Sequence, residues 1–308
     1  MSAAPDPTAT RSRLGILALI LCAALWSLNG PLIKLLNAEG VPGITIACYR
    51  SLIGGAFFLL FAWRRADTLR RVSAGWPIAS ILTFTLMTAS FVIANTMTAA
   101  ANAIILQYTS PIWVFLLAPL LLGERPGRTE GLMLLIAMVG VGIVFFGSNA
   151  TDTAGLSVAL LSGLGYGALT VTLRGLRPVH PAVVAAMNAL GSGLLLVLPM
   201  AVWGTFGLTP RAAGLLLFMS LVQFTAPYVL FSWALQRVPA HQAALIVLLE
   251  ALLNPLWTYL IVGEPVPRAT RVGGPLILVG VAAWLVLLAR RRASRAAPST
   301  AASAAARG

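Results

Sequence analysis

One carboxylate and one guanidinium lie deep within long apolar runs of this chain, where either could bind an ionic group. Glu250 is the one acidic residue well inside such a run, nine residues after His241. On a helix that spacing corresponds to a depth of ~13 Å. A carboxylate in hydrocarbon is costly unless it faces water, has a partner or takes up a proton. Glu250 is therefore expected to bind a cationic group or a proton; the alternative is a structural side chain satisfied by a neighbouring helix.

Arg50 is the basic counterpart, about six residues into the second apolar run, which is ~9 Å on a helix. A guanidinium can bind a carboxylate through two parallel hydrogen bonds, which an ammonium does less well. Arg50 could therefore bind a substrate carboxylate, form an ion pair with Glu250, or extend to the lipid headgroups. The sequence leaves these three alternatives open.

Polar and aromatic side chains inside the apolar runs are further candidates for binding a small molecule. Glu250, Asn254 and Trp257 are spaced by four and three residues, so they share one face of a helix. Polar groups avoid lipid and must face a cavity or another helix, and hydrogen bonding between helices is the simpler explanation. The remaining candidates are Thr88, Asn95, Asn102, Gln107 and Tyr228, with the aromatic residues Trp26, Tyr108 and Tyr166.

The composition indicates which elements must position these side chains. Of 308 residues, 59% are hydrophobic and 9% charged, and the mean hydropathy is +0.91. Soluble domains carry about 25% charged residues, and the apolar runs have the length that crosses a ~30 Å hydrocarbon core. The chain is therefore expected to be an all-α membrane protein of ten transmembrane helices. The predicted spans are 14–36, 44–63, 76–97, 103–122, 130–147, 154–173, 181–202, 212–235, 241–261 and 271–289.

The net charge of +13 could suggest a nucleic-acid partner, but its distribution favours another explanation. With ten spans, the segments on the side of the termini carry 16 basic residues and those on the other side carry 4. This is the positive-inside bias. It predicts that both termini are cytoplasmic, in a bacterial-type inner membrane, and no nucleic acid is needed. Residues 1–13 and 293–308, rich in Ala, Ser, Pro and Arg, are expected to be disordered tails.

The two halves of the chain resemble each other at a constant offset of 140 residues. Matching pairs include Lys34 with Arg174, Ser80 with Ser220, Gly123-Glu124 with Gly263-Glu264, and Val139-Gly140-Val141 with Val279-Gly280-Val281. The repeats, 14–147 and 154–289, hold five predicted helices each, and an odd number inverts the second copy in the membrane. Transporters commonly rock such repeats about a midplane site. The alternative is that duplication merely enlarged the bundle.

Prolines predict where the helices bend. Asn29-Gly30-Pro31 should bend or break the first span, because proline lacks a backbone donor. Pro111 and Pro255 are also expected to kink their spans. Glu124 and Glu264 end their helices and are expected to be turn residues.

The fourth helix of each repeat ends in a Gly-Glu pair, within Leu122-Gly123-Glu124 and Val262-Gly263-Glu264, and the first helix contains Trp26-Ser27. In these features the chain resembles the EamA family of the drug/metabolite transporter superfamily. The resemblance covers about residues 14–289. It implies a ten-helix bundle with a central cavity that exports amino acids, related metabolites or toxic compounds. Members often carry Glu-Pro in the ninth helix, whereas Ala251 follows Glu250 here, so any kink is expected to have moved.

The sequence contains no nucleotide-binding loop, metal-binding cluster or catalytic triad, so neither an enzyme nor a cofactor or metal is predicted. We expect a secondary transporter that exports a small metabolite, such as an amino acid, across the inner membrane by alternating access. The alternative is a membrane sensor or accessory subunit without transport activity. Glu250 could couple transport to protons, and passive facilitation fits the sequence equally well.

Overall fold

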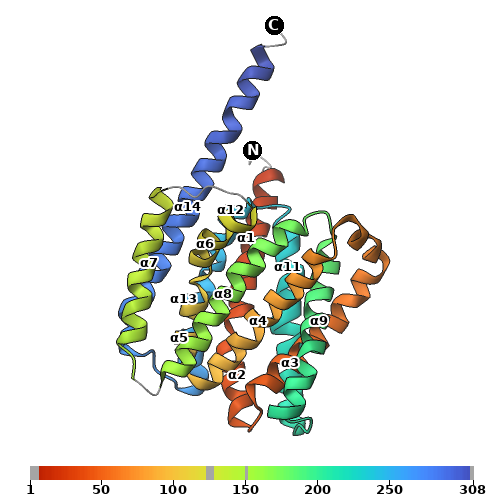
Figure 1. The fold of residues 1–308 in the computed structure, drawn as a ribbon, viewed down its shortest axis with the longest axis vertical. Helices are drawn as coiled ribbons and strands as arrows, with labels where there is room; N and C mark the ends of the chain where they lie inside the picture. The colour runs from red at the N-terminus through yellow and green to blue at the C-terminus, as the bar shows by residue number, and fades with distance from the viewer. Residues whose placement is uncertain (1–6, 123–127, 150–151, 306–308) are drawn as a thin grey trace, which may run out of the picture.

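The computed structural model describes residues 7–122, 128–149 and 152–305, and every regular element in these ranges is a helix. Within them, nine helices are long and apolar enough to cross a membrane, and a shorter apolar helix covers Gly131–Phe146. Figure 1 shows a bundle of long helices with both chain termini at the same end. We call that end terminal and the opposite end distal. The predicted all-α membrane class is confirmed.

The helices follow the order expected from the two repeats. The first repeat contains α1 (Pro7–Ser27), α2 (Asn29–Ala38), α3 (Gly43–Ala62), the 3₁₀-helix η1 (Trp63–Arg71), α4 (Gly75–Met97), α5 (Ala100–Gln107), α6 (Ser110–Leu122) and α7 (Arg128–Phe146). The second contains α8 (Thr153–Gly175), α9 (Pro181–Trp203), α10 (Pro210–Phe218), the π-helix η3 (Met219–Thr225), α11 (Ala226–Ala234), α12 (Ala240–Val247), α13 (Leu249–Val262) and α14 (Arg268–Ala305). Gly123 and Glu124 of the first Gly-Glu pair lie outside the described residues.

The helices at the two ends of the chain extend beyond the predicted spans. α1 begins at Pro7, and α14 continues as a helix to Ala305, whereas the composition predicted disordered tails on both sides. Ala and Arg are among the strongest helix formers, which explains why a helix can continue through such a stretch without apolar packing.

Among the described residues three spans are interrupted, and the eighth passes through the π-helix η3 without a break. The first breaks between α1 and α2, as the Asn29-Gly30-Pro31 motif predicted, and its repeat counterpart α8 is continuous. The fourth breaks between α5 and α6, where Pro111 fits the first turn of the new helix. The ninth breaks at Leu248, which is Tyr108 plus the 140-residue offset. Pro255 lies inside α13 without ending it, so the main interruption lies before Glu250 rather than after it.

Small residues let repeat-related helices approach closely. α3 packs against its counterpart α9, and α7 against its counterpart α14. A Cβ added to Gly140 would lie 2.6 Å from the carbonyl oxygen of Gly273, and one added to Gly280 would lie 2.8 Å from that of Met133. Gly280 and Gly273 are the repeat counterparts of Gly140 and Met133, at the offset of 140 residues. Each of the two helices therefore places a glycine against the equivalent backbone carbonyl of the other, so the contact between α7 and α14 is symmetric.

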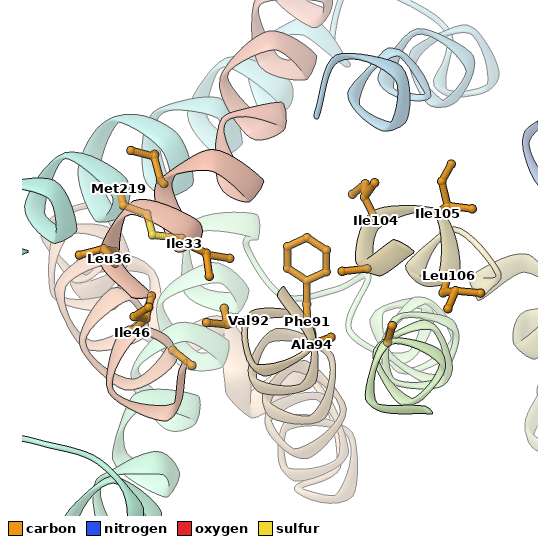
Figure 2. Packing of buried hydrophobic residues seen from close by; sticks show 14 of the residues in the cluster. Ile33, Leu36, Ile46, Phe91, Val92, Ala94, Ile104, Ile105, Leu106 and Met219 are labelled. Carbon is orange, nitrogen blue, oxygen red and sulfur yellow. The ribbon is translucent and has the colours of Figure 1, made fainter. Parts of the chain in front are cut away.

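The largest buried apolar cluster ties the interrupted spans together. Figure 2 shows that side chains of α2, α3, α4, α5 and η3 contribute to it. The labelled members are Ile33, Leu36, Ile46, Phe91, Val92, Ala94, Ile104, Ile105, Leu106 and Met219. The cluster therefore packs α2 and α5, the distal halves of the first and fourth spans, against continuous helices.

The close contact of α7 with α14 gives a matched pair of substitutions. Gly140→Ala should destabilise the protein by about 1–3 kcal/mol, because the added methyl group overpacks a backbone contact. Gly142→Ala, on the same helix, meets open space and should leave stability unchanged or raise it through better helix propensity. The unfolding temperature in detergent tests this, and equal effects of the two changes would contradict the packing described here.

Candidate functional site

Tyr108 joins the two interrupted helices of the fourth and ninth spans. It caps the carboxyl end of α5, and its hydroxyl lies 3.1 Å from the carbonyl oxygen of Val247 and 3.2 Å from Oε2 of Glu250. Val247 is the last residue of α12, and Glu250 lies in the first turn of α13. The hydroxyl is the donor toward both oxygens, so the carboxylate is bound where two broken helices face each other.

Aromatic side chains of α8 and α11 lie near this carboxylate, and one of α1 packs against the one of α11. Tyr166 of α8 and Tyr228 of α11 are close enough to Glu250 to interact with it electrostatically. Trp26 of α1 contacts Tyr228 edge to face, with ring centroids 5.3 Å apart. Glu250, Tyr228 and Trp26 are only partly buried, and Tyr166 is 37% exposed. Side chains of α5, α8 and α11 therefore lie near the carboxylate of Glu250, and Trp26 of α1 packs against one of them.

Arg50 is buried between neutral partners. It is 3% exposed, so it does not extend to the headgroups. Nη1 donates to Oδ1 of Asn29 at 3.0 Å, Nη2 donates to Oγ1 of Thr88, and the guanidinium lies over the Phe224 ring at 5.1 Å. Among the described residues it forms no ion pair with Glu250. Neither the ion pair with Glu250 nor the extension to the headgroups is therefore seen, and binding of a substrate carboxylate by Arg50 stays a prediction.

Asn254 lies on α13, one helical turn beyond Glu250. Its side chain packs against the first turn of α2. Its side chain is fully buried against Gly30, where an added Cβ would be 2.6 Å from its Oδ1. Within the described part of the chain, neither polar atom of its amide has a hydrogen-bond partner. The buried indole Nε1 of Trp257 is also without one there.

Of the other predicted residues, Asn95 and Asn102 form hydrogen bonds within or between helices away from Glu250. Asn95 donates from Nδ2 to the carbonyl of Phe91 in its own helix. Asn102 donates to Thr98 and accepts from Thr270 of α14, which ties α5 to the last span. Gln107 is half-buried beside Tyr108 at the end of α5. The predicted residues thus fall into a cluster around Glu250, a second around Arg50, and structural positions.

Two residues near the site were missed by the sequence reasoning. Gln223 of η3 is buried and donates from Nε2 to the carbonyl of Trp26, at 3.1 Å. That carbonyl lies one residue from the end of α1, so the amide satisfies a group that the break in the first span exposes. Asn29 was noted only as part of a helix-breaking motif. In each case the side-chain amide within an apolar run could have marked the residue, because a buried amide needs hydrogen-bond partners.

An ion pair closes the distal end. Lys34 Nζ lies 2.7 Å from Oε2 of Glu264 and donates to the carbonyl of Thr98 at 2.9 Å. Oε1 of Glu264 accepts from the backbone N–H of Ala100, the first residue of α5, at 2.7 Å. A carboxylate is favourable at a helix N-terminus. We call Lys34, Thr98, Ala100 and Glu264 the distal lock; it gives Glu264 a role beyond that of a turn residue.

Comparisons with known proteins agree with this architecture. An uncharacterized transporter of Archaeoglobus fulgidus is 28% identical over 88% of this chain and 97% of its own length. The pseudopaline exporter CntI of Pseudomonas aeruginosa is 28% identical over 86% of this chain and 93% of its own. A crystal structure with 19% identity superposes with a TM-score of 0.61 over 91% of this chain and 99% of that one, which supports the fold alone.

The two halves of the chain also match one family separately. Residues 13–146 and 153–286 each match the EamA-like transporter family. These ranges agree with the two repeats seen in the 140-residue offset and in the symmetric contact of α7 with α14. The chain is therefore a multi-pass membrane protein that belongs to the EamA-like transporter family.

Proposed function

We propose that the protein is a secondary transporter that exports a small metabolite, such as an amino acid, by alternating access. The observation that carries this proposal is the intramembrane carboxylate of Glu250, bound by Tyr108 where two interrupted helices meet. Broken helices near the membrane midplane form substrate sites in many transporters. The relative CntI is named as an exporter, which favours the same direction here.

The proposal includes ten spans arranged as inverted repeats. α7 serves as the fifth span, and the equivalent breaks at Tyr108 and Leu248 support a common ancestral unit. The reciprocal contacts of Gly140 and Gly280 support a pseudo-two-fold axis. Five spans in each repeat place that axis in the membrane plane, so rocking one repeat against the other exchanges access between the two sides.

The contacts between helices favour an inward-facing state. At the distal end, α2 contacts both α5 and α13, and the distal lock joins all three regions. Toward the terminal end, α1 contacts α11 and α12, and α8 contacts α6; among the described residues no extensive contact joins α8 to α11 or α12. A site closed distally and accessible from the terminal side would load an export substrate from the cytoplasm.

The orientation follows from charge. Both termini lie at one end in Figure 1, and the basic residues of the chain concentrate in segments at that end. The positive-inside rule makes it the cytoplasmic face of an inner membrane. The lipid bilayer and a small molecule are then the partners, nucleic acid is not one of them, and Glu250 is the group able to carry a coupling proton.

Replacing Glu250 tests the core of the proposal. Glu250→Gln keeps size but removes the charge and the proton-binding group, so transport should fall to background while the unfolding temperature changes little. A resistance screen in overexpressing cells first finds the exported compound, and its uptake into inverted vesicles measures transport. Glu39→Gln, which alters a carboxylate paired with Arg211 at the distal surface, is the matched control. Full transport by well-folded Glu250→Gln protein would remove this carboxylate from the site.

The distal lock should contribute more than a surface ion pair does. In a double-mutant cycle, replacing Lys34 and Glu264 singly and together by Gln should show a coupling larger than the ~0–1 kcal/mol of exposed pairs. Lys34 and Glu264 are 19% and 23% exposed, whereas Arg211, paired with Glu39, is 72% exposed and provides the comparison cycle. Unfolding temperatures measure both cycles. Equal coupling in the two would argue against a lock.

The orientation can be tested at the carboxyl end. At a fusion point after Arg290-Arg291-Arg292, a reporter that works only in the cytoplasm should be active, and one that works only in the periplasm should be inactive. The reason is that basic segments remain on the cytoplasmic side. Activity of a periplasmic reporter alone at this position would overturn the orientation, and with it the assignment of the distal end to the periplasm.

A further inference from the structure

An apolar groove runs between α1 and α11 at the terminal end of the bundle. It holds about 380 Å³ of space. Both helices belong to segments long and apolar enough to cross a membrane. The groove is lined by Leu14, Leu17 and Leu21 of α1 and by Val229, Leu230 and Trp233 of α11.

The groove faces away from the candidate site. Trp26 of α1 and Tyr228 of α11 contact each other on the side of Glu250. Leu21 lies five residues before Trp26, and Trp233 lies five residues after Tyr228. Five residues correspond to a rotation of ~140° around a helix of 3.6 residues per turn. The groove therefore opens on the far side of both helices, toward the lipid.

The depth of the groove matches one leaflet of a bilayer. It starts at Leu14, directly after Arg13, where the first candidate span begins. From Leu14 to Leu21 a helix rises ~10 Å, which is most of one leaflet of a ~30 Å hydrocarbon core. The groove therefore follows the course of an acyl chain from the interface toward the midplane.

A cation lies at the interfacial end of the groove and touches both of its walls. The guanidinium of Arg237 lies over the Trp233 ring, 3.6 Å from its centroid, and Nη1 donates to the carbonyl of Trp233 at 2.8 Å. On the other wall, a Cβ added to Gly15 would lie 3.0 Å from that of Arg237, and Gly15 follows Leu14. A guanidinium has five N–H donors, so donors remain for the oxygens of a phosphate.

The charges around this end are all positive. Arg13 is exposed and lies next to Leu14 in the chain. Neither residues 7–27 nor residues 226–248 contain Asp or Glu. A zwitterionic headgroup brings an ammonium group that such a surface repels, whereas an anionic headgroup brings negative charge alone. Basic residues beside membrane spans favour anionic lipids for this reason.

We propose that this groove binds one anionic phospholipid. An acyl chain lies along Leu14, Leu17 and Leu21, and the phosphate accepts hydrogen bonds from Arg237. The bound lipid links α1 to α11 on the outer side of the two helices whose inner side carries Trp26 and Tyr228. The proposal goes beyond the proposed function, because lipid binding depends on neither the substrate nor the direction of transport.

The experiment compares two lipids that differ in headgroup charge. The delipidated full chain in detergent is titrated with phosphatidylglycerol and with phosphatidylethanolamine of the same acyl chains, and native mass spectrometry counts the bound molecules. The first phosphatidylglycerol should bind about fivefold more tightly, the effect of about one basic residue near an anionic headgroup. Arg237→Gln should abolish this preference. Arg237→Lys should keep part of it, because the charge remains but the planar donor fork is lost.

Two further variants separate the groove from general surface charge. Val229→Trp places a larger side chain in the groove at an exposed position, so it should weaken the binding of both lipids even if Arg237→Gln folds poorly. Arg64→Gln is the matched control, because Arg64 also lies over a tryptophan ring, that of Trp63 at 4.9 Å, and neither residue lines this groove. It should leave the preference unchanged.

Three outcomes would overturn the lipid site. The first is equal binding of the two lipids by the unmodified chain. The second is an effect of Arg64→Gln as large as that of Arg237→Gln, which would show that diffuse charge causes the preference. The third is a dimer that Val229→Trp dissociates, since a second copy of the chain would then occupy the groove.

Discussion

Inside a bilayer, every polar group must be satisfied by protein or by enclosed water, since lipid offers no hydrogen bonds. This constraint governs the three interrupted spans. Each break frees backbone groups that a continuous helix would have paired, and side chains from other helices bind some of them. Gln223 bonds the carbonyl of Trp26 beside the first break, and Tyr108 bonds that of Val247 before the third. Polar side chains are thus required where the helices break, and the charged residues Arg50 and Glu250 lie among them.

The scaffold around the breaks is made of continuous helices. α3 with α9 and α7 with α14 pack closely through small residues, and these pairs relate one repeat to the other. Close backbone approach makes such contacts intolerant of added volume. The interrupted helices, by contrast, have ends that can shift without breaking a continuous hydrogen-bond ladder. Rigid pairs and divided spans together suit the proposed rocking mechanism, which requires a stable frame and a site between the repeats.

The repeats are alike in frame but different in the chemistry that they contribute. The first span is broken and α8 is not, and the positions of Tyr108 and Glu250 are occupied in the other repeat by Leu248 and Ser110. An internal duplication preserves packing positions because both halves must fit the same bundle. Binding residues are free of that requirement, because a single substrate needs only one set of partners. The asymmetry is therefore concentrated where the helices break.

Much of this architecture is determined by the amino-acid sequence alone. The lengths of the apolar runs, the distribution of arginine and the 140-residue offset predicted a membrane bundle with two repeats, because these features depend on local composition and on chain order. The motif Asn29-Gly30-Pro31 predicted the break in the first span, since the lost donor of a proline acts locally. Glu250 and Arg50 were recognised because a charge in an apolar run is rare.

Only the tertiary structure decided which of these groups meet. No residue near Leu248 is of a type that commonly breaks a helix. Pro255 is of that type, but it lies within α13. The bond of Tyr108 to Glu250 and the ion pair of Lys34 with Glu264 join residues far apart in the chain. Arg50 lies beside Asn29 and Thr88 rather than Glu250. Helical periodicity gives the face and depth of a residue, but the neighbouring helix is chosen by packing over the whole bundle, which no local pattern encodes.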